Sequence, residues 1–282
     1  MDILFCTIAT KYRLYQCIAL YNSLRRQHPD AIMAVLCMDE PVVSLLEKAS
    51  LPGMWLVPLE MLEDKELLEV KSERSLGEYC WTMKPVLIQY LFEKYEEAEI
   101  VAYMDSDLYF FDDPAKLLKK DWNWNVIVTT HKINRKVNSG FLAFKRSRTT
   151  YRLLEWWRRK CTIWCYSRKE GHNYGDQGYL DAIRKIFYGV RYLDNPGVNI
   201  APWNCHNYDF SMRNGKLYVN RCRLVFFHFS GFRIRKPGAG SIAFDIDVPC
   251  EVCGAYLRDI VRGLELVNSI DCEMTDNFYM GI

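Results

Sequence analysis

The feature that most constrains this chain is a short apolar run that ends in two aspartates one residue apart. Residues 100–104 read Ile-Val-Ala-Tyr-Met, which is typical of a buried strand, and Asp105-Ser-Asp107 follows directly. Open α/β sheets bind their ligands at the carboxyl ends of the strands. Two carboxylates held this close repel each other, and a hard divalent cation relieves that repulsion. We therefore expect a Mn²⁺ or Mg²⁺ site here, with the cation also holding a nucleotide diphosphate.

The aspartate pair alone has two other interpretations. Aspartate caps helices and accepts hydrogen bonds in turns, so the pair could be purely structural. Phosphatases of the haloacid-dehalogenase type also carry Asp-x-Asp after a strand, with Thr or Val two residues beyond the second Asp. Tyr109 stands at that position here, which counts against a phosphatase.

Apolar runs of strand length alternate with helical periodicity in the first half of the chain. Strands are expected at 2–9, 31–38 and 54–58, with helices between them. A longer helical stretch covers 76–95, but Lys84-Pro85 lies inside it, so we expect two helices or one that begins near Met83. This order predicts an α/β fold, a mixed, mostly parallel sheet flanked by helices.

The second half mixes its elements. Strands are expected at 125–129, 140–144 and 223–229, and helices at 147–166, 175–187 and 251–266. We expect one domain over residues 1–282. Within it, 1–114 would form a Rossmann-like half that binds the nucleotide sugar, and 115–282 an acceptor and sugar half with a closing C-terminal helix.

Composition excludes several classes of protein. The net charge of +2 gives no field that would favour nucleic acid, and no apolar run approaches the length of a membrane span. The N-terminus lacks the basic region of a signal peptide, and eleven cysteines, an odd number, suit a reducing compartment. We expect a cytoplasmic protein, with peripheral contact at the inner face of the membrane left open. Cys161 with Cys165, and Cys250 with Cys253, are half-sites for zinc that match no complete template.

A histidine near the end of the last predicted strand is a candidate third metal ligand. His228 precedes a loop with Gly231, Arg233, Arg235 and Lys236. Nitrogen ligands suit Mn²⁺ better than Mg²⁺, and the cations could hold a diphosphate. The alternative is a histidine at the edge of the core followed by a solvated basic loop.

Three further polar segments could contact a sugar. They are Asn138-Ser139-Gly140, Asp176-Gln177 and Trp203-Asn-Cys-His-Asn207. Each also has a structural interpretation, respectively a turn, a helix N-terminus and a corner of the core.

Taken together and in order, these motifs resemble retaining glycosyltransferases of family 8, the group with glycogenin and bacterial lipopolysaccharide galactosyl- and glucosyltransferases, on a GT-A fold. The matching residues are Thr7-Ile-Ala9-Thr10, Lys84, Asp105-Ser106-Asp107, Asn138-Ser139-Gly140, Asp176-Gln177, His228-Phe-Ser-Gly231 and Lys236-Pro237. The resemblance implies that Asp105, Asp107 and His228 bind Mn²⁺. It also implies that the end of the first strand, with Thr7, Ala9, Thr10 and Tyr12, contacts the nucleoside.

The resemblance further implies donor-sugar contact by Asp176 and Gln177, the candidate catalytic residues, and diphosphate binding by Lys236. Lys236 lies two residues further from His228 than is usual in the family, so Arg233 and Arg235 remain alternatives for that role. The implied activity is metal-dependent transfer of a hexose, with retention, from a UDP-sugar to a hydroxyl of a glycan, a lipid-linked glycan or a protein.

Two rival functions remain. A nucleotidyltransferase that makes sugar nucleotides would carry a Gly-rich loop after the first strand, where this chain has Ala-Thr-Lys-Tyr-Arg13. A non-catalytic nucleotide-sugar-binding module would keep the fold without the turnover.

Overall fold

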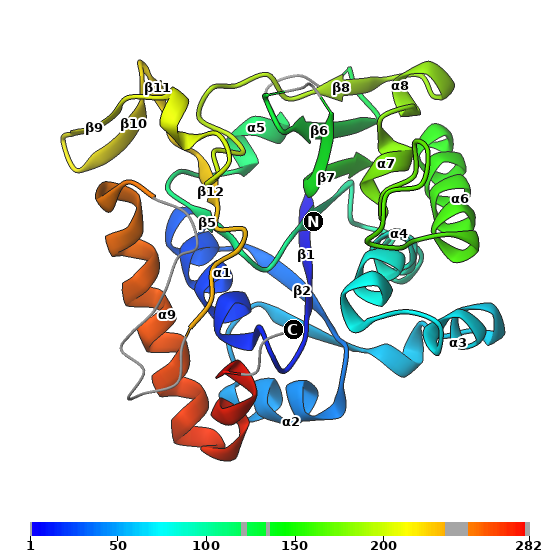
Figure 1. Cartoon of the computed structure of the whole chain (residues 1–282), viewed down its shortest axis with the longest axis horizontal. Coiled ribbons are helices and arrows are strands. Elements are labelled where there is room, and N and C mark those ends of the chain that lie inside the picture. Colours follow the sequence, from blue (N-terminus) through cyan, green and yellow to red (C-terminus); the bar gives the residue numbers. More distant parts are fainter. Residues whose placement is uncertain (1, 120–122, 134–135, 235–247, 280–282) are drawn as a thin grey trace.

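The computed structural model describes residues 2–119, 123–133, 136–234 and 248–279. A seven-stranded sheet runs through the centre, with helices on both faces (Figure 1). The strands, in spatial order, are β3 (Met54–Pro58), β2 (Ile32–Cys37), β1 (Ile3–Ala9), β4 (Ile100–Met104), β7 (Val137–Lys145), β6 (Val126–Thr130) and β8 (Val190–Tyr192).

Strand directions confirm the predicted mixed, mostly parallel sheet. β1 is parallel to β2 and β4, with Phe5 opposite Met33 and Ala102. β7 runs antiparallel to both β4 and β6, and β8 is again parallel to β6. The carboxyl end of β4 therefore lies beside the beginning of β7.

Alternating side chains of β1 reach two separate cores. Phe5 packs in one core with helices α1 (Leu14–Gln27), α2 (Glu40–Ala49) and α9 (Cys250–Ile270). Leu4 and Cys6 pack in the other core with α4 (Leu76–Lys94) and α6 (Arg148–Ile163). Burial on both faces explains why the strand sequences are continuously apolar.

The remaining elements surround this sheet. The helical ones are α3 (Lys65–Lys71), α5 (Ala115–Lys119), α7 (Gln177–Leu180), α8 (Ile183–Ile186), and the 3₁₀ turns η1 (Leu59–Met61), η2 (Cys205–Asn207) and η3 (Glu273–Tyr279). Two small sheets complete the fold. One pairs β5 (Leu108–Phe110) with β12 (Phe226–His228), and the other joins β9 (Phe210–Arg213), β10 (Lys216–Val219) and β11 (Cys222–Arg223). No helix in the described part of the chain is long and apolar enough to cross a membrane.

The predicted break at Pro85 is wrong, because α4 continues through it as one helix. A proline inside a helix costs about 3 kcal/mol. Two features oppose that cost. A capping box between Ser75 and Glu78 fixes the N-terminus of the helix, and Met83 and Leu87 are fully buried beside the proline.

Other boundaries also differ from the prediction. The single helix expected at 175–187 is two short helices, α7 and α8, and the strand expected at 223–229 is split into β11 and β12. Asn138, Ser139 and Gly140 lie inside β7 instead of in a turn before it. The β9–β10 hairpin was not predicted, although Asn214-Gly215, both with positive φ, is a strong hairpin signal.

Candidate metal and nucleotide site

Pairing between β5 and β12 brings His228 to the aspartates. β5 begins directly after Asp107, and His228 is the register partner of Leu108. The backbone N–H of Phe229 donates to the carbonyl of Asp107 at 2.8 Å, which fixes the two chains beside each other. The imidazole therefore reaches the end of β4 from a part of the chain that is distant in sequence.

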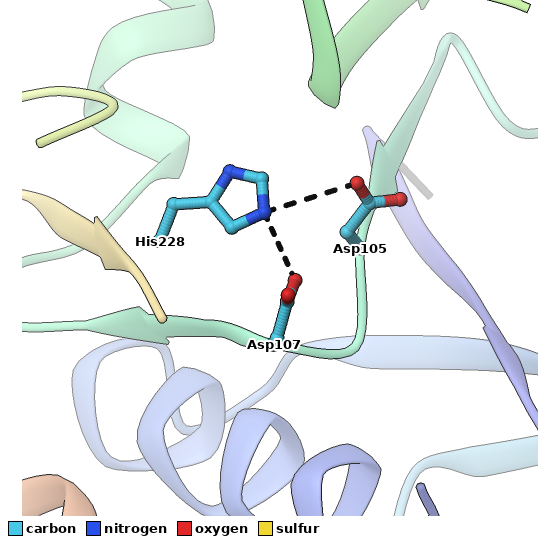
Figure 2. Close-up of side chains that lie close together, drawn as sticks. All are labelled: Asp105, Asp107 and His228. Atoms are coloured by element: carbon cyan, nitrogen blue, oxygen red, sulfur yellow. Dashed lines mark ion pairs between the residues drawn. The ribbon is translucent and has the colours of Figure 1, made fainter. Parts of the chain in front are cut away.

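Asp105, Asp107 and His228 converge on one point (Figure 2). His228 Nε2 lies 3.0 Å from Asp107 Oδ1 and 4.0 Å from Asp105 Oδ2. Ligands held about 2.1 Å from a cation in octahedral geometry lie about 3 Å apart when adjacent and about 4 Å apart when opposite. The donor set and its spacing thus suit a hard or borderline divalent cation.

The charges at this point support one another. Burial alone would raise the pKa of Asp107, but the neighbouring His228 brings it below the ordinary aspartate value. Burial likewise disfavours a charged His228, yet Asp107 and Asp105 raise its pKa. A cation would take the place of the imidazolium proton between these groups.

Asn199, which the sequence did not suggest, orients the imidazole. Its Oδ1 lies 3.4 Å from His228 Nδ1, and its Nδ2 donates to the carbonyl of Thr130 at 2.9 Å. The amide is fully buried and the residue has a φ of 51°. A hydrogen bond from Nδ1–H to this oxygen leaves Nε2 as the free lone pair that faces the aspartates.

Gly140 allows the imidazole to lie close to β7. A Cβ at this position would lie 2.6 Å from Cε1 of His228. The backbone of Gly140 also accepts from the N–H of Asp105 at 2.8 Å. The absence of a side chain at Gly140 therefore allows β12 to lie close to the end of β4.

Lys84 forms a second, buried group of charges next to the aspartate pair. Its Nζ lies 3.0 Å from Asp105 Oδ1 and 3.4 Å from Asp176 Oδ2, and donates to Ser139 Oγ at 3.0 Å. Burial works against the ammonium, but the two carboxylates raise the pKa of Lys84 above its usual value. Burial raises the pKa of Asp176, and Lys84 offsets only part of that effect. Tyr103 also donates to Asp105 Oδ1, at 2.9 Å.

A cavity of about 350 Å³ opens beside the aspartates, at the carboxyl end of β1. The sequence-predicted residues that line it are Thr10, Lys84, Asp105, Ser106, Asp107, Gly231 and Arg233. Arg13, Gln16 and Trp81 also line it, although the sequence analysis did not select them. The buried hydroxyl of Thr10 has no hydrogen-bond partner among the described residues, which makes it available to a ligand.

Other candidate residues lie elsewhere. Thr7 and Ala9 are fully buried within β1, and Asn138, Ser139 and Gly140 belong to β7 and are not among the residues that line the cavity. Tyr12 is half-buried in the turn before α1. Arg235 and Lys236 lie outside the described residues.

Gln177 lines a different cavity, of about 1040 Å³, together with His131 and Trp203. The Trp203 ring contacts two histidines, with its centroid 5.1 Å from that of His131 and 5.3 Å from that of His228. Trp203 therefore adjoins both the larger cavity and the metal site. Asp176 precedes Gln177 and is 2% exposed, so the two candidate catalytic residues face different surroundings.

The zinc half-sites acquire no third ligand in the described segments. There, Asp105, Asp107 and His228 are the one group of three or more His, Cys, Asp or Glu whose ligand atoms lie within 4.8 Å of one another. Cys161 and Cys165 are buried free thiols.

The sheet order and the placement of Asp105 after β4 define the class: the chain has the GT-A fold of glycosyltransferases. No protein-family model matches it. It is 35% identical over 247 residues to the uncharacterized protein YfnF of Bacillus subtilis (strain 168), and the aligned region covers 82% of each chain. It is 32% identical over 291 residues to YfnD of the same organism, also uncharacterized, covering 97% of this chain and 94% of YfnD. The chain belongs to the family of these two proteins.

Solved structures share the fold at low sequence identity. The galactosyltransferase LgtC, in complex with donor and acceptor sugar analogs, has a TM-score of 0.57 at 19% identity and covers 96% of both chains. The bifunctional glycosyltransferase WbbM has a TM-score of 0.56 at 13% identity, covering 98% of this chain and 51% of WbbM. Mouse xyloside xylosyltransferase 1 has a TM-score of 0.51 at 12% identity, covering 82% of this chain and 98% of that one.

Proposed function

We propose that the protein is a metal-dependent glycosyltransferase that moves a hexose from a nucleotide diphosphate sugar, a UDP-sugar, to a hydroxyl group of a glycan acceptor. One observation carries this proposal: the convergence of Asp105, Asp107 and His228 at the carboxyl end of β4, beside a cavity that both aspartates line. The GT-A fold and the transferase names of the structural neighbours support it.

We assign the cation to Asp105, Asp107 and His228, with Mn²⁺ preferred because one ligand is an imidazole nitrogen. When bound, a divalent cation supplies positive charge that stabilises the diphosphate as it leaves. Arg233, in the wall of the same cavity, would add to that stabilisation. Lys84 would hold Asp105 in place and neutralise Asp176.

The proposed division of labour follows the two cavities. Residues 1–114 supply most of the smaller cavity and would bind the nucleotide, with Thr10, Arg13 and Trp81 near the nucleoside. Residues 115–282 supply the larger cavity and would bind the acceptor. Gln177 lines the acceptor side and is our candidate for contact with the donor sugar. We also propose that the transfer retains the anomeric configuration, as the resemblance to family 8 glycosyltransferases implies.

The test is a screen of UDP- and GDP-sugars for Mn²⁺-dependent hydrolysis by the full chain, and the release of nucleoside diphosphate is the quantity measured. We expect one donor to be hydrolysed, EDTA to abolish the activity, and Asp107→Asn to remove it without unfolding the protein. Asp30→Asn is the matched control, because Asp30 is an exposed loop residue far from β4 in the sequence. Retention is read separately, as the anomeric configuration of the product by NMR.

Three results would overturn the proposal. Full turnover by Asp107→Asn would show that the reaction does not need the metal site. Release of pyrophosphate from UTP and a hexose 1-phosphate would identify a nucleotidyltransferase. Calorimetric binding of UDP with Mn²⁺, without hydrolysis of any donor or transfer, would identify a binding module.

A further inference from the structure

The cavity of about 1040 Å³ has a composition that the proposed transfer reaction does not by itself require. Residues of α7 and α8 line it, among them Gln177 and Lys185. Helix α7 packs against β7, and α8 packs against β8, the strand at the end of the sheet opposite β3; Figure 1 shows α7 and α8 near these two strands. Gln177 and Trp203 line it, and the Trp203 ring also contacts His228. A molecule in this cavity is thus a neighbour of the metal site.

Positive charge dominates the lining. Three lysines, Lys136, Lys169 and Lys185, face one carboxylate, Asp181. The whole chain carries a net charge of only +2, so this one cavity holds as large an excess of positive charge as the entire sequence. Charge gathered in a concave site raises the local concentration of anions.

The carboxylate in the lining is held in place by the backbone of β7. Asp181 Oδ1 accepts a hydrogen bond from the backbone N–H of Val137 at 2.7 Å, so this carboxylate holds α7 and α8 to β7. By contrast, the exposed side chains of Lys169 and Lys185 have no hydrogen bond or ion pair in the segments that the structure describes. Their ammonium groups are available to a ligand.

The hydrogen-bonding capacity also favours an anion over a neutral sugar. A sugar hydroxyl needs acceptors as well as donors, whereas a lysine ammonium only donates. Beyond Asp181, the side chains of the lining that can accept a hydrogen bond are neutral, namely Gln177, Tyr174, His131 and His172. Lysine is a common phosphate ligand, and Trp203 offers an apolar ring face against which a pyranose can pack.

We propose that the acceptor is a sugar that carries an anionic group, a phosphate or a carboxylate, bound in this cavity by Lys169, Lys185 and Lys136. The inference rests on the proposed function and names its acceptor class. The anionic group lies against the lysines, and the sugar ring lies near Gln177 and Trp203.

The experiment uses the full chain saturated with UDP and Mg²⁺ and three matched probes: glucose, glucose 6-phosphate and glucuronate. Binding is followed by ligand-observed NMR at low and high salt. We expect both anionic sugars to bind about tenfold more tightly than glucose at low salt, and the preference to shrink at high salt. Tighter binding of glucose 6-phosphate than of glucuronate would identify phosphate as the group, and the reverse order carboxylate.

Variants separate the cavity from direct contact of a phosphate with the cation. Lys169→Gln/Lys185→Gln should lose most of the preference for the anionic sugars. Lys48→Gln/Lys94→Gln removes the same charge from exposed positions in α2 and α4 and should keep that preference. The inference is overturned if glucose binds as tightly as the anionic sugars, if no probe binds, or if the Lys169/Lys185 variant behaves like wild type.

The two proposals can fail separately. Donor hydrolysis by the wild type, without any preference for an anionic sugar, would overturn the acceptor class alone. A lysine-dependent preference in a protein that hydrolyses no donor would overturn the transferase and leave an anionic-sugar site.

Discussion

Replacing Lys84 with methionine tests the buried charges beside the metal site most sharply. The substitution keeps the length of the side chain and removes the ammonium that lies 3.0 Å from Asp105 and 3.4 Å from Asp176. Asp105 is 27% exposed and water can solvate it, whereas the side chain of Asp176 is 4% exposed. The cost therefore falls mainly on Asp176.

The expected loss of unfolding free energy for Lys84→Met is about 3–5 kcal/mol, the range for removing one partner of a buried ion pair. Coulomb attraction at 3.4 Å with an effective dielectric constant of 20 is about 5 kcal/mol, which agrees with that range. The assay is urea unfolding at pH 7 in EDTA, with Lys48→Met as the control for loss of an exposed lysine. EDTA removes any cation that would mask the effect.

The loss should also depend on pH. Burial raises the pKa of Asp176, and without Lys84 the largest opposing effect is gone, which leaves hydrogen bonds such as the one with Ser139 to oppose burial. The folded state then binds a proton more tightly than the unfolded state, so the unfolding free energy of Lys84→Met should rise as the pH falls from 7 towards 5. Lys84→Met/Asp176→Asn should recover most of the lost stability. A loss below about 1 kcal/mol in the single variant, or no recovery in the double variant, would refute the reasoning.

Three further predictions concern side chains around this centre. Asn199→Ala should weaken Mn²⁺ binding about 10- to 100-fold, because the imidazole of His228 loses the partner of its Nδ1. Unchanged affinity in a Mn²⁺ titration would show that Asn199 does not orient His228 for metal binding. Gly140→Ala should weaken Mn²⁺ binding by displacing His228, whose Cε1 would lie 2.6 Å from the new methyl group, and a wild-type affinity would contradict this. Glu78→Gln should lower the unfolding free energy at pH 7 by about 1–2 kcal/mol, because a neutral amide replaces the carboxylate that accepts hydrogen bonds from Ser75 and Ser167. Burial opposes the shift, but hydrogen bonds from Ser167 and Ser75 lower the pKa of Glu78 to about 2, so its contribution is present above pH 4.5 and lost as the pH falls towards 2. Urea unfolding between pH 3 and 7 should show a smaller acid loss in Glu78→Gln than in wild type, and an equal loss would contradict the assignment.

Local patterns in the sequence predict much of this fold. The apolar runs of β1, β2 and β4 identify a covered parallel sheet, and Asp105-Ser-Asp107 directly follows β4. Turn chemistry would also have predicted the β9–β10 hairpin from Asn214-Gly215.

Contacts between residues distant in the sequence could not be predicted from local sequence patterns. Pairing of β12 with β5 places His228 at the aspartates, and a two-residue periodicity does not say which strand will be the partner. Asn199 reaches His228 from a loop with no recognisable motif. Pro85 signals a break in α4, but tertiary packing overrides that local preference.

The central claim is that Asp105, Asp107 and His228 together coordinate a cation that also binds the nucleotide phosphates. Electron paramagnetic resonance of free Mn²⁺, titrated with the full chain with and without UDP, measures this directly. The account predicts one Mn²⁺ site whose affinity rises when UDP is present. It also predicts at least a tenfold loss of affinity in Asp107→Asn and in His228→Ala, with no change in Asp30→Asn. Mn²⁺ binding that is the same in all four proteins, or that does not respond to UDP, would contradict it.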